Sequence, residues 1–203
     1  MSNDYVLSQN IPNILIVDDV PANLILLGHI LKNLGYKVRP VPNGMLALKV
    51  AEKEKPDLIL LDVMMPDMDG FEVCRRLKED QNLSDVPIIF ISALSDTNDI
   101  IKALTCGGAD YIAKPFHAEE VKARVATHLK LYQQSKELQK INAEKDKFFS
   151  IIAHDPNLFR LFENLLQKII LSTKATDEKS GESSAGLDLL LCKEFIEKHG
   201  GKI

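Results

Sequence analysis

Four short, strand-like runs are each followed by polar side chains that could take part in chemistry. The side chains that follow these runs are Asp18 with Asp19, Asp62, Ser92 and Lys114. Clustered carboxylates repel one another unless a cation joins them, and a site made of oxygen ligands favours Mg²⁺. A hydroxyl and a lysine beside such a cluster can hold the other oxygens of a phosphoryl group. These residue types therefore indicate Mg²⁺-dependent phosphoryl transfer onto a carboxylate, with Asp62 as the nucleophile.

The elements that must position these side chains alternate between strands and helices. Strands are expected over residues 13–17, 36–41, 58–61, 86–91 and 109–113. Helices are expected over residues 21–33, 43–51, 69–79 and 97–106, with a fifth from about residue 117. Continuous apolar runs are typical of strands buried on both faces, so this order predicts an α/β domain with a five-stranded, doubly wound parallel sheet. Ligands bind beyond the carboxyl ends of the strands in such sheets, which brings the polar residues to one edge.

The first expected helix has a clear apolar face. Its members are Leu24, Leu27, Ile30, Leu31 and Leu34. Because their spacing is three and four residues, they should face the sheet together.

Composition is that of an ordinary globular protein. The 203 residues carry a formal net charge of −4 without blocks of like charge, so no contact with nucleic acid is indicated. The three cysteines are an odd number without CxxC spacing, which indicates neither a disulfide framework nor a zinc site. An N-terminal tail, residues 1–11, lacks the segments of a secretion signal, and no apolar run approaches the roughly 20 residues that cross a bilayer. We therefore expect a cytoplasmic protein with no membrane contact.

Residues 12–130 resemble the receiver domain of a two-component response regulator. The resemblance rests on the pair Asp18–Asp19, on Asp62 followed by MMPDMDG, on Ser92 followed by alanine, and on Lys114–Pro115. Each motif alone is a common turn or cap feature, whereas the right residue type at four strand ends is specific. The resemblance implies a flavodoxin-like fold and a phosphorelay, in which a cognate histidine kinase or phosphotransfer protein phosphorylates Asp62.

The resemblance also implies a set of Mg²⁺ ligands. Asp19 would be the principal ligand, and Asp18 would act partly through water. Asp62 and the backbone carbonyl of Met64 would complete the set. Mg²⁺ is therefore the cofactor that we expect.

Two further residues would form a switch by the same resemblance. Tyr111 matches the aromatic residue that swings inward when Ser92 is drawn toward the phosphoryl group. With Lys114, these residues would let the receiver assist its own phosphorylation and dephosphorylation. The resemblance also implies that the Lys114–Pro115 peptide is cis.

A helical pattern continues beyond the receiver as a stalk over residues 131–155. Its repeat positions, spaced three and four residues apart, are Leu131, Gln134, Leu138, Ile141, Lys145, Phe148 and Ile152. A heptad pattern of this kind is typical of a coiled coil, so it predicts a homodimer through the helix 131–152. The alternative is a single helix that lies back on its own receiver.

The stalk ends in KFFSIIAHD, which resembles the phosphoacceptor motif of sensor histidine kinases. The resemblance makes His154 a second candidate phosphoacceptor, exposed on the helix, with Asp155 as the partner that helps the imidazole act as a nucleophile. Pro156 departs from the family, in which proline stands five residues after the histidine. Because proline disfavours helix at the preceding residue, we expect the helix to stop or kink at Asp155.

Residues 156–203 resemble a truncated remnant of the kinase ATP-binding domain. Two helices are expected there, over residues 158–171 and 187–199. Asp188 stands where that family has glycine and would repel the phosphates of ATP. The segment is also too short for the ATP-binding core. We therefore expect no ATP-dependent kinase activity from this hybrid-kinase-like arrangement.

Three functional hypotheses follow. The leading one is a phosphoacceptor response regulator in which modification of Asp62 changes dimerisation or partner binding. The alternative from the enzyme class is a hybrid histidine kinase or phosphotransfer protein that carries phosphate on His154. The third is a scaffold without phosphotransfer.

Overall fold

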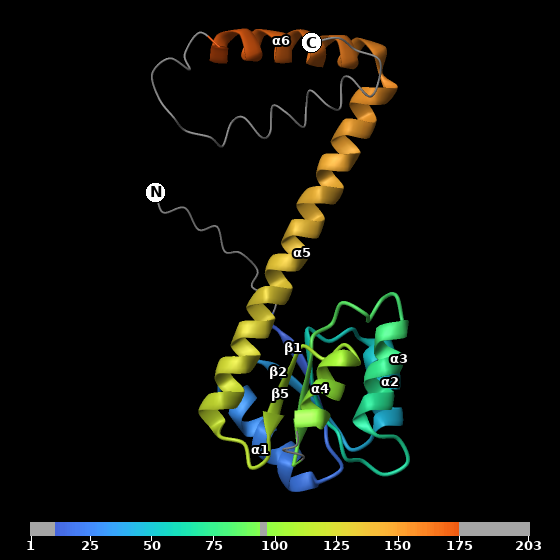
Figure 1. Cartoon of the computed structure of the whole chain (residues 1–203), viewed down its shortest axis with the longest axis vertical. Coiled ribbons are helices and arrows are strands. Elements are labelled where there is room, and N and C mark those ends of the chain that lie inside the picture. The colour runs from blue at the N-terminus through green and yellow to red at the C-terminus, as the bar shows by residue number, and fades with distance from the viewer. Residues whose placement is uncertain (1–10, 94–96, 175–203) are drawn as a thin grey trace. The chain divides into compact units, whose positions relative to one another are not determined.

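A five-stranded parallel sheet forms the centre of the N-terminal part of the chain (Figure 1). Its strands, in the spatial order β2-β1-β3-β4-β5, are β1 (Asn13–Val17), β2 (Lys37–Val41), β3 (Leu58–Asp62), β4 (Ile88–Ser92) and β5 (Asp110–Ala113). All four neighbouring pairs are parallel. The expected α/β fold with a doubly wound, flavodoxin-like sheet is therefore confirmed.

Helices cover both faces of this sheet. The first core packs β-strand residues against α1 (Pro21–Lys32) and the N-terminal part of α5 (Ala118–His154). The second core packs the opposite face against α2 (Gly44–Lys53), α3 (Gly70–Glu79) and α4 (Thr97–Thr105). The two layers of helices explain why the central strands are apolar on both sides.

Strand β1 shows how one run supplies both cores. Ile14 and Ile16 lie in the core under α1 and α5, whereas Leu15 and Val17 lie in the core under α2, α3 and α4. Successive side chains of a strand point to opposite faces, so an uninterrupted apolar run is needed when both faces are covered. All residues of β1, β3 and β4 are buried accordingly.

Side-chain caps begin two of the helices that flank the sheet. The Asn43 side chain accepts the N–H of Leu46 at 2.9 Å, and the Asp69 side chain accepts the N–H of Glu72 at 2.8 Å. Each cap satisfies a backbone donor that has no partner within the helix. The caps therefore fix where α2 and α3 start.

The C-terminal end of α1 differs from the expectation in one respect. Leu34 is 42% exposed, so its expected place on the buried face was wrong. The helix ends at Lys32, and Gly35 has a φ of 83°, which glycine adopts without steric cost. Leu34 thus lies in the turn that follows the helix.

The chain divides into two compact units, Met1–Ser135 and Lys136–Ile203. The structure, a computed structural model, describes residues 11–93 and 97–174. Residues 1–10 of the expected tail over residues 1–11, and the helix expected over residues 187–199, lie outside the described residues. Within the described ranges, no helix is long and apolar enough to cross a membrane.

In the second unit, α5 is followed by α6 (Pro156–Lys174). Three aromatic rings join the two helices: the centroid of Phe162 lies 6.2 Å from that of Phe148 and 6.3 Å from that of Phe149. The expected helix end at Asp155 is confirmed. The Asp155 carboxylate accepts the N–H of Asn157 at 2.9 Å, so it caps α6.

Candidate functional site

The carboxyl ends of the strands bring the predicted chemical residues to one edge of the sheet. Asp18 directly follows β1, Asp62 and Ser92 are the last residues of β3 and β4, and Lys114 directly follows β5. Carboxylate oxygens of Asp18, Asp19 and Asp62 lie within 4.8 Å of one another. The structure therefore assembles the acidic cluster that the sequence predicted.

Lys114 supplies positive charge inside this cluster. Its Nζ atom lies 2.9 Å from Oδ2 of Asp18 and 2.8 Å from Oδ2 of Asp62. Burial alone would lower the pKa of Lys114, but its hydrogen bonds to Asp62 and Asp18 outweigh burial and raise that pKa above its ordinary value. The lysine is thus held in its charged form between the two carboxylates.

Asp62 is a carboxylate that is almost completely removed from solvent. Asp62 is only 3% exposed, and its burial raises the pKa of the carboxyl group. The hydrogen bond from Lys114 opposes this effect. The neighbouring Asp18 raises that pKa further. A buried anion that depends on one lysine and lies near other anions gains stability from additional positive charge.

The two members of the acidic pair have different surroundings. Asp18 is 1% exposed and accepts hydrogen bonds from Val20, Asn23 and Lys114. Asp19 is half-buried, and within the described residues no hydrogen bond or ion pair reaches its carboxylate. The sequence did not single out Asn23; its only signal was an amide in the first turn of the helix after the acidic pair.

The loop after Asp62 is fixed by a close backbone approach. A Cβ atom on Gly70 would lie 2.2 Å from the backbone oxygen of Asp62, and the N–H of Gly70 donates to Val63 O at 2.9 Å. Asp67 in the same loop has a φ of 65°. The glycine of MMPDMDG is therefore required because α3 begins in contact with the end of β3.

Met64 lies in this loop, beside the expected phosphoacceptor. Its N–H is 3.4 Å from Oδ1 of Asp62, and its side chain is exposed. Its expected role as a metal ligand concerns the backbone carbonyl and stays a prediction.

Ser92 and Tyr111 lie on neighbouring strands. Ser92 is fully buried, and Tyr111 is 8% exposed. The Tyr111 hydroxyl donates to the backbone oxygen of Ser92 at 3.3 Å. The aromatic ring that the resemblance expected to swing inward thus lies inward in this structure.

The peptide between Lys114 and Pro115 is cis, as the resemblance implied. A hollow of about 410 Å³ opens beside Lys114 and is lined by Asn23, Leu26, Lys114, Pro115 and Phe116. The hollow therefore lies between α1 and the segment after β5, next to Asn23 and Lys114, which both contact Asp18.

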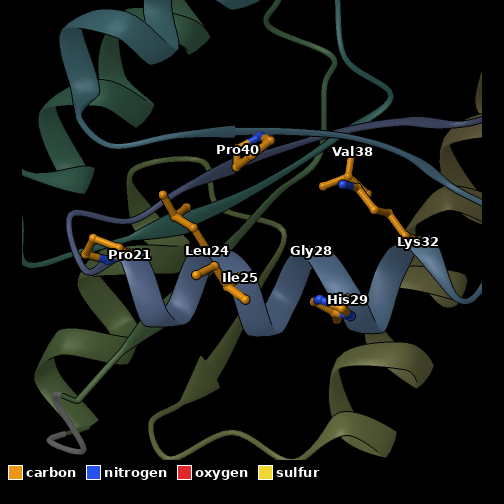
Figure 2. A pocket seen from close by; sticks show the side chains of 8 residues that line it. All are labelled: Pro21, Leu24, Ile25, Gly28, His29, Lys32, Val38 and Pro40. Atoms are coloured by element: carbon orange, nitrogen blue, oxygen red, sulfur yellow. The ribbon is translucent and has the colours of Figure 1, made fainter.

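A second hollow of about 460 Å³ lies between α1 and β2 (Figure 2). It is mostly apolar, and none of the predicted site residues lines it. Its lining residues are Pro21, Leu24, Ile25, Gly28, His29, Lys32, Val38 and Pro40.

His154 belongs to the second unit and has different neighbours from those expected. Its side chain is exposed, as predicted, and its Nδ1 atom lies 2.8 Å from the backbone oxygen of Ser150. Asp155, which was expected to assist the imidazole, instead places Oδ1 on the N–H groups of Asn157 and Leu158. The carboxylate thus acts as a helix cap.

A flavodoxin-like domain with acidic residues, a hydroxyl and a lysine at the carboxyl edge of its sheet defines the receiver class of signalling proteins. Residues 14–126 match the family described as "Response regulator receiver domain". The chain belongs to that family.

Individual relatives support the same assignment. The chain is 41% identical over 119 residues to the DNA-binding dual master transcriptional regulator RpaA of Synechocystis sp.. This match covers 59% of the chain and 49% of RpaA. The chain is 45% identical over 112 residues to the response regulator PleD of Caulobacter vibrioides, in a match that covers 55% of this chain and 25% of PleD. The matches thus span half or less of these relatives' own length.

A solved structure shares the fold of the receiver region. It is a putative response regulator from Chloroflexus aurantiacus J-10-fl, with a TM-score of 0.57 and 34% identity, and the match covers 59% of this chain and 98% of the other.

Receiver domains bind Mg²⁺ at an acidic pocket, and the residues here fit such an ion. Three carboxylates can each offer one oxygen within 4.8 Å of the others, and oxygen ligands are those that Mg²⁺ prefers. Burial raises the pKa of Asp62, so a nearby cation would favour its charged form.

Proposed function

We propose that this chain is a phosphoacceptor response regulator of a two-component phosphorelay. Asp62 accepts a phosphoryl group from a cognate histidine kinase or phosphotransfer protein. The observation that carries this proposal is the placement of the Lys114 ammonium 2.8 Å from Asp62, beside a cluster of three carboxylates. An acidic site with an internal lysine suits the transfer of an anionic group onto a carboxylate.

Asp18, Asp19 and Asp62, with the carbonyl of Met64, would hold Mg²⁺. When bound, the ion offsets the negative charge of the carboxylates and of the phosphoryl oxygens. A carboxylate oxygen of Asp62 attacks phosphorus, an O–P bond forms, and the bond from phosphorus to the donor breaks with its electron pair leaving on the donor. Lys114 already contacts the attacking carboxylate, so its charge can stabilise a phosphoryl oxygen attached there.

The proposed switch links the phosphoryl group to the surface formed by α4, β5 and α5. Ser92 ends β4, the strand that pairs with the end of β3 at Asp62, and its backbone oxygen accepts the hydroxyl of Tyr111 on β5. If the Ser92 hydroxyl is drawn toward the phosphoryl group, the position of Ser92 changes, and with it the contact that Tyr111 makes to its backbone oxygen. The result would be altered dimerisation through residues 131–152, or altered binding of a partner.

The contribution of residues 131–203 stays a prediction. Resemblance to a histidine-kinase remnant motivates it, but the family match ends at residue 126. His154 contacts the backbone of its own helix, and Asp155 caps α6. Neither contact favours phosphate transfer through His154.

Labelling of Asp62 tests the proposal. The full chain is incubated with acetyl phosphate and Mg²⁺, and its intact mass is measured. Wild type should gain one phosphoryl group, and Asp62→Asn should gain none, because an amide oxygen is a poor nucleophile. Asp67→Asn, which changes an exposed acid of the same loop, is the matched control and should label like wild type. An unlabelled wild type, or equal labelling of Asp62→Asn, would reject the proposal.

A further inference from the structure

Asp18 is held by an unusually full set of donors. Its Oδ1 atom accepts the N–H of Val20 at 2.8 Å and Nδ2 of Asn23 at 3.0 Å. Its Oδ2 atom accepts Nδ2 of Asn23 at 2.9 Å and Nζ of Lys114 at 2.9 Å. Three donor groups therefore surround a carboxylate that has about four acceptor positions, so its orientation is fixed while one position is left.

Asn23 is the only side chain that contacts both oxygens of Asp18 among the hydrogen bonds of the described residues. Asn23 is itself fixed, because its backbone N–H donates to Val20 O at 3.0 Å in the first turn of α1. The amide therefore holds the plane of the carboxylate against rotation. It also leaves Oδ2 directed at Lys114, which in turn contacts Asp62.

The neighbouring acid has no such restraint. Within the described residues, no hydrogen bond or ion pair reaches the carboxylate of Asp19. One of its carboxylate oxygens nevertheless lies within 4.8 Å of a carboxylate oxygen of Asp18 and of Asp62. Asp19 is thus available to bind a cation directly, whereas Asp18 is already held in place by protein donors. The difference between the two acids comes from contacts made by Val20, Asn23 and Lys114.

We propose that Asn23 is a positioning residue that locks Asp18 beside Lys114 and thereby sets the Mg²⁺ affinity of the cluster. This inference rests on the proposed function, because it concerns the same acidic site. Residues that orient metal ligands from behind commonly change metal affinity about 10- to 100-fold when they are removed. Without Asn23, Asp18 gains rotational freedom that must be lost again when the ion binds.

The test is calorimetric titration of the full-length chain with Mg²⁺ in the absence of any phosphodonor. Asn23→Ala and the nearly isosteric Asn23→Leu remove the donor, and we expect each to weaken Mg²⁺ binding about 10-fold or more. Asn23→Gln keeps an amide and should recover part of that loss. Asn33→Ala, at the exposed C-cap of the same helix, is the matched control and should bind like wild type.

A second readout separates positioning from a purely structural role. The rate of labelling by acetyl phosphate is measured as a function of Mg²⁺ concentration. For the donor-free variants, the half-saturating concentration should rise by the same factor as the calorimetric dissociation constant. A residue that only supports α1 would lower the unfolding midpoint without moving this concentration.

The outcomes also separate this inference from the proposed function. Suppose that wild type binds Mg²⁺ and accepts the phosphoryl group, and that the Mg²⁺ dissociation constant of Asn23→Ala or Asn23→Leu is within twofold of that of Asn33→Ala. The role of Asn23 is then rejected, and the phosphoacceptor proposal stands. Should wild type itself bind no Mg²⁺ and accept no phosphoryl group, both are rejected. Leucine at position 23 keeps the test informative if alanine prevents folding.

Discussion

The hydroxyl of Tyr111 donates a hydrogen bond to the backbone carbonyl oxygen of Ser92 across 3.3 Å. Tyr111 lies on β5 and Ser92 on β4, and Tyr111 is only 8% exposed. Their contact joins the edge strand β5 to the strand that carries the hydroxyl of the site. It fixes the inward position of the ring by a polar contact as well as by packing.

Removal of this hydroxyl should cost stability without disturbing the acidic cluster. Tyr111→Phe loses one buried hydrogen bond, so we expect a loss of about 1 kcal/mol in the free energy of unfolding. Mg²⁺ affinity should stay as in wild type, because Tyr111 is not among the cluster's ligands. Urea denaturation and calorimetric titration measure the two quantities. Tyr36→Phe, at a half-buried tyrosine, is the control, and an equal effect of both substitutions would contradict the prediction.

Two glycines should respond to alanine with opposite signs. A Cβ atom at Gly70 would lie 2.2 Å from the backbone oxygen of Asp62, so Gly70→Ala must displace the start of α3 or the end of β3. We expect a loss of roughly 1–3 kcal/mol, as for other overpacked sites. The phosphoacceptor would shift as well, so labelling by acetyl phosphate should slow.

Gly28 is the matched control for this prediction. It lies within α1 beside the hollow of Figure 2, and a Cβ atom there would meet no atom within 4 Å apart from its chain neighbours and the backbone of its own helix. Because alanine favours helix over glycine, Gly28→Ala should stabilise the chain by about 0.5–1 kcal/mol. The midpoint of thermal unfolding is measured for both variants. A lower midpoint for Gly28→Ala, or an unchanged midpoint for Gly70→Ala, would contradict this prediction.

The sequence was sufficient for the sheet and for the types of residue at its edge. Strands buried on both faces require continuous apolar runs, and β1 and β3 have them, so their ends at Asp18 and Asp62 were predictable. The roles of residues that depend on contacts between distant parts of the chain could not be predicted in this way. The role of Asn23 depends on the direction of its amide, and Gly70 is required because of an approach between two backbones. Leu34 fitted the helical spacing, but the turn at its glycine neighbour ended the helix first.

Asp110 should make the receiver sensitive to acid. It bonds Arg124 at 2.8 Å and His128 at 3.0 Å. Burial alone would raise the pKa of Asp110, but its hydrogen bonds from the Tyr111 N–H, Arg124 and His128 outweigh burial and lower that pKa below its ordinary value of 3.8. The stability contributed by a carboxylate with a lowered pKa is fully present above the unfolded value of 3.8 and is lost as the pH falls through the folded value.

Asp110→Asn removes this contribution. At neutral pH the variant should be less stable than wild type by roughly 1 kcal/mol, since it loses charged hydrogen bonds at a partly exposed site. The difference should shrink as the pH falls below 3.8. Urea denaturation at several pH values measures it, with Asp146→Asn, at an exposed residue of the second unit, as the control. A difference that is independent of pH would mean that the charge of Asp110 does not contribute.

The remaining prediction concerns the apolar stripe of α5. Leu131, Leu138 and Ile141 are 54%, 62% and 51% exposed, and they follow the heptad positions on which the predicted homodimer depends. A partner helix would bury this stripe, so the molar mass in solution should depend on it. Light scattering in Mg²⁺, with and without beryllium fluoride as a substitute for the phosphoryl group, gives that mass. If the receiver controls association, a monomer should become a dimer when beryllium fluoride is added.

Substitution of the stripe shows whether it is the interface. Leu138→Glu places a charge at a heptad core position and should shift the equilibrium at least about 10-fold toward monomer, because burying an unpaired carboxylate costs more than 1.4 kcal/mol. Gln139→Glu adds the same charge on the adjacent exposed position and should leave the mass unchanged. A dimer in both phosphorylation states would make the stalk a constitutive connector and place the output in a partner of the receiver. A monomer in both states would reject the coiled-coil prediction.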